Sequence, residues 1–352
     1  MGWWPIGRRG RARTLSGMQM DAGVLADFAR GCAVLGSGGG GSPAAVTRPL
    51  AEQAIEECGP VPVVAAGELP EDAFVMPVGL IGSPAVAEER IGSRAEPARM
   101  RERVEALHGR PVAAVLCSEI GGLNGCTAVA WAARLGLPLL DADAMGRAFP
   151  RMDQNVLELA GLRPGPTVLA DEYGRTVVLD HVDGPWLEEL ARAAVATFGG
   201  HAATSEYPLT AGQAARHAVA GSVTRAVAVG RGEGPPALLT GKVASVRRDV
   251  GDATRVLLEG TGTDAGRLVR IEARSEFVAA LEDGRTLALV PDVIALVDVH
   301  SGWAVPVEEV RYGLRVRLHA LPSAPVWYSE AGLRLAGPTA FGLHGLTREG
   351  AS

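Results

Sequence analysis

The stretch from Val112 to Pro150 constrains the fold more than any other part of the chain. It reads VAAVLCSEIGGLNGCTAVAWAARLGLPLLDADAMGRAFP: an apolar run, a polar glycine-rich turn, a segment with helical spacing, a second apolar run and an acidic loop with an arginine. Apolar runs of about four to eight residues that alternate with a helical segment are typical of a parallel βαβ unit. The stretch therefore predicts a layered α/β domain with a mostly parallel sheet.

Polar side chains follow both predicted strands of this unit. Glu119 and Asn124 come after the first strand, and Asp141, Asp143 and Arg147 come after the second. Because ligands bind outside the carboxyl ends of parallel strands, we expect these five side chains to converge on one pocket. In this hypothesis Glu119, Asp141 and Asp143 are catalytic, with Glu119 as the general base. Asn124 and Arg147 bind the substrate, the arginine by pairing with a carboxylate.

Structural roles are alternatives for most of these residues. Asp141 and Asp143 can cap the turn that follows them, and Asn124 can cap the helix behind it. Arg147 can form a structural salt bridge. Glu119 directly follows a buried run and is the hardest of the five to explain without a function.

A metal site is a further alternative for the three acids. Glu119, Asp141 and Asp143 can ligate a divalent metal ion, whose bound water would then be the nucleophile. No histidine lies near them in the sequence, whereas a catalytic zinc site usually includes one. The sequence leaves this alternative open, and the cofactor is otherwise unknown.

A second glycine-rich segment, GSGGGGSP, spans Gly36 to Pro43 and precedes a predicted helix that reaches Glu57. Glycine backbone ahead of a helix N-terminus presents N–H groups to a ligand. The glycines match G-x-G-x-x-G, but the apolar run before them is short for a strand, and no Lys-Ser/Thr follows. We therefore expect no nucleotide, with a flexible linker as an alternative. The glycines predicted to bind substrate, here and in the central turn, are Gly38, Gly39, Gly40, Gly41, Gly121 and Gly122.

The pattern changes after residue 165. Two short strands and two helices are predicted up to Val229, and short β-rich runs separated by turn residues dominate from about residue 237, as in a small antiparallel barrel or sandwich. The sequence thus predicts a disordered extension (1–20), an α/β domain with the site (21–165), a β-rich C-terminal domain with a few helices (166–346) and a tail (347–352).

Composition excludes several classes of protein. The net charge is −6, and four arginines lie in the first twenty residues, so the remaining chain is acidic and nucleic-acid binding is not expected. The four cysteines form no CxxC pair, which favours reduced thiols. No apolar run approaches about 18 residues, and no secretory signal is recognisable. We expect a cytoplasmic protein without a membrane partner, whose start is Met1, Met18 or Met20.

Several segments match a known family in the order in which that family shows them. They are GSGGGGSP, the Glu89-Arg90 pair, SEIGGLNG, LPLLDADAMGRAFP, LTGKV, PDVIALVD, VRYGLRV and GPTAFG. Over roughly residues 21–345 the chain resembles the S-methyl-thiohydantoin desulfurase family, formerly an uncharacterised-domain family that is often encoded beside hydantoinase/oxoprolinase-type proteins. The E-I-G-G-x-N and D-A-D-x-M-G-R-A-F-P strings are the specific ones.

The resemblance implies an activity. In this family water attacks the sulfur-bearing carbon of a cyclic S-methyl-thiohydantoin, methanethiol leaves and a hydantoin remains. Because the Glu89-Arg90 pair matches the family, the resemblance implies that Glu89 also binds the substrate. One departure is Arg274-Ser275-Glu276, where relatives commonly show an Asn-Glu pair; a different substrate is implied if that asparagine contacts it.

Two other classes of function remain open. The first is a non-catalytic small-molecule-binding or accessory subunit that serves a hydantoinase/oxoprolinase-type partner. The second is a nucleotide-dependent enzyme that uses the Gly36 to Gly41 loop. In every case the expected ligand is a small molecule, and a homo-oligomer is compatible with the sequence.

Overall fold

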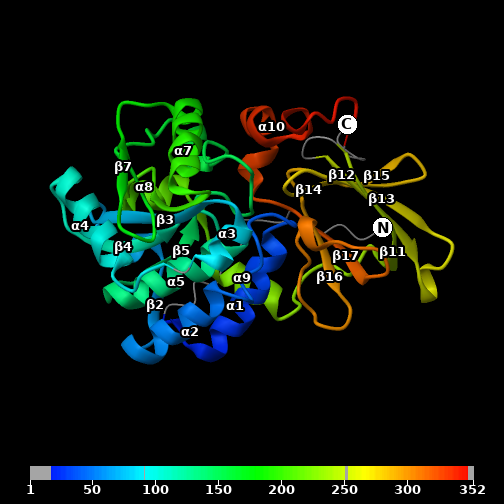
Figure 1. The fold of residues 1–352 in the computed structure, drawn as a ribbon, viewed down its shortest axis with the longest axis horizontal. Helices are drawn as coiled ribbons and strands as arrows, with labels where there is room; N and C mark the ends of the chain where they lie inside the picture. The colour runs from blue at the N-terminus through cyan, green and yellow to red at the C-terminus, as the bar shows by residue number, and fades with distance from the viewer. Residues whose placement is uncertain (1–16, 91, 250–252, 348–352) are drawn as a thin grey trace.

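The computed structural model describes residues 17–90, 92–249 and 253–347, and within them the chain forms two β-sheets that lie side by side (Figure 1). The first sheet has the strand order β1-β2-β5-β4-β3-β8-β6-β7, with β10 beside β5 and β9 beside β3. Its strands are β1 (Gln19–Met20), β2 (Val61–Val64), β3 (Phe74–Gly82), β4 (Val112–Cys117), β5 (Leu139–Asp143), β6 (Thr167–Ala170), β7 (Thr176–Leu179), β8 (His201–Ser205), β9 (Leu209–Thr210) and β10 (Val219–Ala220).

The centre of the first sheet is parallel, and its edges are antiparallel. Strands β2, β5, β4 and β3 run parallel to one another, while β1, β8 and β6 continue the sheet in antiparallel pairing. The α/β fold predicted from the central stretch is therefore confirmed, with a sheet that is mixed beyond its parallel centre.

Helices cover both faces of this sheet. One face packs against α1 (Ala22–Leu35), α2 (Thr47–Cys58), α4 (Glu96–His108), α5 (Leu123–Leu135) and α9 (Ser222–Gly230). The other packs against α6 (Val156–Leu159), α7 (Gly184–Phe198) and α8 (Ala211–His217). The short α3 (Pro84–Glu89) follows β3.

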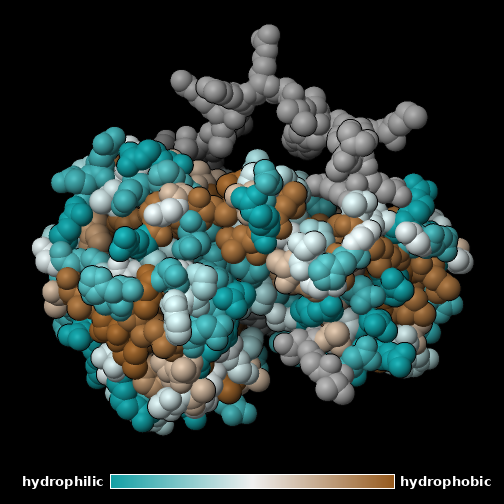
Figure 2. Space-filling model, turned by 90° about the horizontal axis from the view of Figure 1, so that it is seen from above, coloured by the Kyte–Doolittle hydropathy of each residue, from teal (hydrophilic) through white to brown (hydrophobic). Residues whose placement is uncertain are grey.

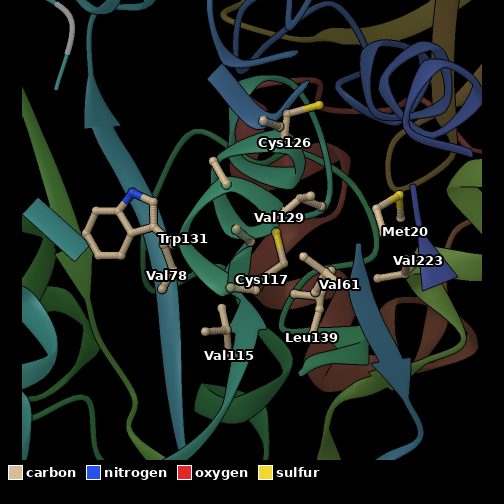
Figure 3. Packing of buried hydrophobic residues seen from close by; sticks show 14 of the residues in the cluster. Met20, Val61, Val78, Val115, Cys117, Cys126, Val129, Trp131, Leu139 and Val223 are labelled. Carbon is tan, nitrogen blue, oxygen red and sulfur yellow. The ribbon is translucent and has the colours of Figure 1, made fainter. Parts of the chain in front are cut away.

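The buried strands explain why both faces are covered. In β4, Val115 and Cys117 contact the first helical layer, and Ala114 and Leu116 contact the second, because successive side chains of a strand point to opposite faces. Figure 3 shows Val115 and Cys117 below the α5 residue Val129. A strand buried on both sides reads as a continuous apolar run, which is the pattern seen in the sequence.

Turns and caps fix the starts of three helices of this layer. Helix α5 begins at Leu123, directly after Gly122, which turns the chain with a φ of 62°. Helix α2 begins at Thr47, after a turn over residues 43–46. Asp21 caps α1, with Val24 N donating to Asp21 Oδ1 at 2.9 Å.

Part of the predicted N-terminal extension is ordered. Gln19 and Met20 form β1 and pair with β2, and the Met20 side chain is completely buried. Residues 1–16 and the tail residues 348–352 lie outside the described residues.

The second sheet is antiparallel throughout, in the order β15-β14-β13-β12-β11-β17-β16. It curls so that β14 approaches β16, and its concave side holds a separate apolar core. Its strands are β11 (Leu239–Arg248), β12 (Thr254–Gly260), β13 (Leu268–Ala273), β14 (Phe277–Glu282), β15 (Arg285–Leu289), β16 (Val293–Asp298) and β17 (Arg315–Leu321). The predicted β-rich C-terminal region is confirmed in this part.

The boundary between the sheets falls later than the predicted boundary at residue 165. Strands β6 to β10 belong to the first sheet, and the second begins only at Leu239. The sequence of a short strand does not show which sheet it joins, because tertiary packing decides which strand it pairs with. After β17 the chain returns to the first domain, where Trp327 Nε1 donates to Met145 O at 2.7 Å from the short turn that precedes α10 (Glu330–Ala336).

Seen from above, the two sheets and their helices form two lobes, and hydrophobic residues gather on part of the N-terminal lobe (Figure 2). Among the described residues, no helix combines the length and apolar character needed to cross a membrane.

Candidate functional site

A cavity of about 730 Å³ opens where the two lobes meet. From the first domain it is lined by residues at the ends of β3, β4 and β8 and by the loop after β5. From the second domain it is lined by the end of β11, the start of β12 and the turn between β13 and β14. Of the two strands predicted to hold the site, β4 reaches this cavity at its end, whereas β5 contributes only through the loop that follows it.

Glu119 lies at the cavity wall immediately after β4, with 8% of its surface exposed. Its Oε1 accepts a hydrogen bond from Asn124 Nδ2 at 3.1 Å, and its Oε2 accepts one from Phe149 N at 3.4 Å. Burial, with a smaller contribution from the nearby Glu276 carboxyl, raises the pKa of Glu119 to about 8, although the two donors oppose this shift. The residue is therefore a carboxyl group poised to exchange a proton near neutral pH.

Asn124 lines the same cavity from the first turn of α5. While its Nδ2 donates to Glu119, its Oδ1 accepts a hydrogen bond from Leu80 N at 2.6 Å. Both ends of the amide are engaged, so the side chain holds the Glu119 carboxyl in one orientation. It does not cap the helix, because it lies within it.

Glu276 also lines the cavity and was not among the predicted site residues. It lies between β13 and β14 and is 2% exposed, with Ser275 Oγ donating to its Oε2 at 2.9 Å. Burial raises the pKa of Glu276 to about 7, and the positive charge of Arg147 works against that rise. The sequence held a signal, since the segment containing Glu276 was the one departure from the family pattern.

The glycine-rich loop after α1 runs between the two carboxyl groups. A Cβ atom added to Gly39 would lie 2.3 Å from Glu276 Oε1, and one added to Gly40 would lie 3.1 Å from Glu119 Oε1. Both glycines line the cavity, as predicted. Because these glycines have no side chains, the Glu276 carboxyl can approach Gly39 and the Glu119 carboxyl can approach Gly40.

The same loop also joins the two domains. Ser37 Oγ lies 3.0 Å from both the N and the O of Ile294, donating to the carbonyl and accepting from the amide. Phe277 N donates to Ser37 O at 2.7 Å, and Val307 N donates to Gly38 O at 2.9 Å. The loop is therefore a fixed structural element, and the flexible-linker alternative is wrong.

The other predicted glycines do not line the cavity. A Cβ on Gly38 would meet the Phe277 ring at 2.5 Å, and one on Gly41 would meet Pro84 Cβ at 2.7 Å. Gly121 and Gly122 pack against the last turn of α1 and the loop after it. Gly122 N donates to Cys32 O at 2.9 Å, and Leu123 N donates to Gly40 O at 2.8 Å. Their role is close packing of two backbone segments.

Asp143 also lies away from the cavity lining and organises the loops behind it. It is completely buried, and its Oδ2 accepts hydrogen bonds from Ile120 N, Met145 N and Gly146 N at 2.9, 3.1 and 2.7 Å. Burial raises its pKa to about 6 against these three donors. Because three amide donors converge on one of its oxygens, Asp143 holds the turns after β4 and β5 together.

Asp141 faces α9 and not the cavity. Its Oδ1 accepts from Thr224 N at 2.9 Å and its Oδ2 from Thr224 Oγ1 at 2.6 Å, so it caps the start of that helix. The expected convergence of all five polar side chains is therefore not what the structure has: Glu119 and Asn124 reach the cavity, whereas Asp141, Asp143 and Arg147 do not.

Arg147 is completely buried beneath the cavity and bridges the domains. Its Nε donates to Ala148 O at 2.8 Å, and its Nη1 donates to Asp292 O at 2.6 Å and to Pro291 O at 3.2 Å. The guanidinium lies 4.7 Å from the centre of the Phe149 ring. Burial lowers the pKa of Arg147 to about 10, so it stays charged at neutral pH. It does not lie where it can pair with a substrate carboxylate.

Glu89 is exposed at the end of α3 and does not line the cavity. Its neighbour Arg90 has a structural role, with Nη1 donating to Phe198 O at 2.9 Å and lying 3.4 Å from Glu172 Oε1. The matching pair is thus placed on the surface beside the cavity wall.

Further polar residues of the cavity were missed by the sequence analysis. Ser118, Thr204 and Glu206 lie in its wall, and the arginines of the lining are Arg151, Arg192, Arg248 and Arg274. Glu206 directly follows β8, which pairs antiparallel with β3, so the argument from the carboxyl ends of parallel strands could not have identified it.

The metal site suggested for Glu119, Asp141 and Asp143 is not assembled, because the two aspartates are turned toward Thr224 and toward backbone amides. More generally, residues 17–90, 92–249 and 253–347 contain no group of three or more His, Cys, Asp or Glu side chains arranged to hold a metal ion.

The two acidic groups give a prediction about pH and stability. Both pKa values are raised above the ordinary value of 4.5, so the folded protein binds these protons more tightly than the unfolded chain. Their contribution to stability is complete below about pH 4.5 and is lost as the pH rises through about 7 and 8, with a slope of up to about 1.4 kcal/mol per pH unit for each group. Urea unfolding of Glu119→Gln/Glu276→Gln should show a flatter decline from pH 5 to 8 than the parent protein. An identical decline would contradict the assigned pKa shifts.

A second prediction concerns the space between the carboxyls. Gly39→Ala should displace the Glu276 side chain and lower the free energy of unfolding by about 1–3 kcal/mol, because the methyl group has no room. Its φ is not positive, so the substitution tests space alone. Gly67→Ala is the matched control, since nothing lies within 4 Å of its added Cβ. Equal stability of the two variants in urea unfolding would show that the loop tolerates a side chain.

Comparisons with known proteins agree with this architecture. A crystal structure of a protein from Chromobacterium violaceum superposes with a TM-score of 0.75 at 23% sequence identity, covering 94% of this chain and 98% of that chain, which shows a shared fold. No curated protein matched. The family model described as S-Me-THD-like, N-terminal domain, matches residues 24–181, and the S-Me-THD-like, C-terminal domain, matches residues 182–233 and 231–348. Since the two models together span nearly the whole chain, this protein belongs to the S-Me-THD-like family.

Proposed function

We propose that this protein is a hydrolase that acts on a five-membered cyclic S-alkyl-thiohydantoin and releases the thiol. The observation that carries the proposal is the pair of buried carboxyl groups, Glu119 and Glu276, which line one cavity and have pKa values of about 8 and about 7. The family name points to the same class of small ring compound.

The reaction consumes one water molecule, whose two protons are replaced by one proton on a ring nitrogen and one on sulfur. The oxygen of water bonds to the sulfur-bearing ring carbon while a base takes one of its protons, and the electron pair of the carbon–nitrogen double bond moves to the ring nitrogen, which gains a proton. The carbon–sulfur bond then breaks as the attached hydroxyl loses its proton to form the carbonyl, and the electron pair leaves with sulfur, which takes a proton from an acid. The products are a hydantoin, whose new carbonyl oxygen comes from water, and a free thiol.

The two carboxyls are suited to opposite roles in this scheme. Glu276 has the lower pKa, near 7, and lies close to the charge of Arg147, so its ionised form is available as the base. Glu119 is mostly protonated at neutral pH because its pKa is about 8, and it serves as the acid that protonates the leaving sulfur. This assignment reverses the role of base expected for Glu119 from the sequence.

Asn124 and Arg147 act through these carboxyls. Asn124 orients Glu119 by donating to its Oε1. Arg147 lies behind the cavity, and its positive charge lowers the pKa of Glu276 and so keeps the base ionised. Both are positioning residues in this proposal.

The proposal is tested by incubating the purified protein with an S-methyl-thiohydantoin in water enriched in oxygen-18. We expect free thiol, measured with a colorimetric thiol reagent, and a hydantoin that carries one oxygen-18 atom. Tight binding of the ring without thiol release would instead support a ligand-binding or accessory subunit. In that case, adding a hydantoinase/oxoprolinase-type partner should raise the partner's activity.

A further inference from the structure

A second group of buried polar side chains lines the cavity and takes no part in the proton transfers proposed above. It consists of Ser118, Thr204 and Glu206, which are 4%, 1% and 6% exposed. Polar groups buried this deeply normally have hydrogen-bond partners, so each one without a partner calls for an explanation.

The three side chains come together at the ends of three adjacent strands. Ser118 follows β4, Thr204 lies in β8 opposite Gly79 of β3, and Glu206 follows β8. A Cβ added to Gly79 would lie 3.1 Å from both Ser118 Cβ and Thr204 Oγ1, so the glycine lets the two hydroxyl-bearing side chains approach the same point. The group is therefore a compact part of the cavity wall.

Two polar atoms of this group have no partner in the described part of the chain: Ser118 Oγ and Glu206 Oε2. The hydroxyls of Thr204 and Ser118 lie near enough to the carboxyl to oppose the rise in the pKa of Glu206 that burial causes. They do not complete its hydrogen bonding. Both unpartnered atoms belong to residues that line the cavity, where a bound molecule can reach them.

We propose that Ser118, Thr204 and Glu206 form a subsite that binds a neutral N–H group of the ligand ring. The inference rests on the proposed function for the nature of the ring. Ser118 and Glu119 are the first two residues after β4 and both line the cavity, so one ring held there can contact both side chains. Glu206 Oε2 accepts the N–H, and Ser118 completes the contact through its hydroxyl.

The test compares the affinities of hydantoin, 1-methylhydantoin and 3-methylhydantoin by calorimetric titration. We expect the protein to bind hydantoin about tenfold more tightly than the analogue that is methylated at the buried nitrogen, because the methyl group removes the donor. Ser118→Ala and Glu206→Met should each abolish most of this preference. Glu206→Gln should keep it, since the amide oxygen still accepts a hydrogen bond.

Ser205→Ala is the matched control. Ser205 is also a buried serine whose Oγ lacks a partner among the described residues, and it is adjacent to Glu206, but it does not line the cavity. This variant should keep the full preference for hydantoin. An equal loss in Ser205→Ala and Ser118→Ala would mean that general loosening is responsible, and the subsite would be rejected.

The remaining outcomes are also decisive. Equal binding of all three rings, or no binding of any of them, would overturn the subsite. Loss of the preference in Glu206→Gln would also overturn it, because it would indicate that Glu206 binds a cationic group of the ligand. The preference can be present while no S-alkyl-thiohydantoin is turned over. The proposed hydrolysis would then fail, and the subsite would stand.

Discussion

Glu119→Gln and Glu276→Gln are each expected to lower kcat for the thiohydantoin substrate by about 10²- to 10⁴-fold, the range typical of a lost general acid or base. An amide matches the carboxyl group in shape but neither accepts nor delivers the required proton. Both carboxyls are buried with raised pKa values, so the neutral amides should leave thermal unfolding at neutral pH nearly unchanged or slightly improved. The measurements are steady-state thiol release and thermal unfolding of each variant.

Glu52→Gln provides the control for these two substitutions. Glu52 is partly exposed on α2, forms a surface ion pair with Arg48 at 2.8 Å and does not line the cavity, so its loss should change neither rate nor stability measurably. If Glu119→Gln or Glu276→Gln retained the rate of the parent, that residue would have no role in proton transfer. If a variant failed to fold, its role would be structural.

Arg147→Met should cause the largest loss of stability among the substitutions considered, about 3 kcal/mol or more. Methionine fills part of the space but leaves the carbonyls of Ala148, Pro291 and Asp292 without the donor that they share. Because two of these carbonyls belong to the second domain, the contact between the lobes should weaken first. Chemical unfolding monitored in both domains measures the effect.

Arg101→Met is the appropriate comparison for Arg147→Met. Arg101 forms an i,i+4 ion pair with Glu105 at 2.8 Å on α4, where the expected cost is below about 1 kcal/mol. A loss of stability in Arg147→Met no greater than in Arg101→Met would show that the buried guanidinium is not needed to hold the domains together. Loss of activity without loss of stability would place Arg147 in direct contact with the ligand.

The central unit of the fold was predictable because its pattern is local. The apolar runs of β4 and β5 and the helical spacing of α5 arise from side chains that must be buried on both faces of a sheet. Glu119 and Asn124 could be assigned to the cavity for the same reason: they follow a strand whose direction in a parallel sheet is known.

The failures of the site prediction share one physical cause. Asp141 and Asp143 lie at the end of β5 and Arg147 follows it, but their partners are Thr224, three backbone amides and the carbonyls of the second domain. A polar side chain at a strand end can satisfy its hydrogen bonds either with a ligand or with distant parts of the chain. Strand position alone does not distinguish the two.

The sequence by itself therefore determined the parallel centre of the first sheet, the β-rich C-terminal region and the position of one acidic group at a strand end. Only the tertiary structure decided that Glu276, from the other domain, faces the same cavity as Glu119, with Gly39 and Gly40 between them. It also decided that β6 to β10 extend the first sheet. The reason is that periodicity reports which side of an element is buried, whereas pairing between segments more than a hundred residues apart depends on how complete surfaces fit together.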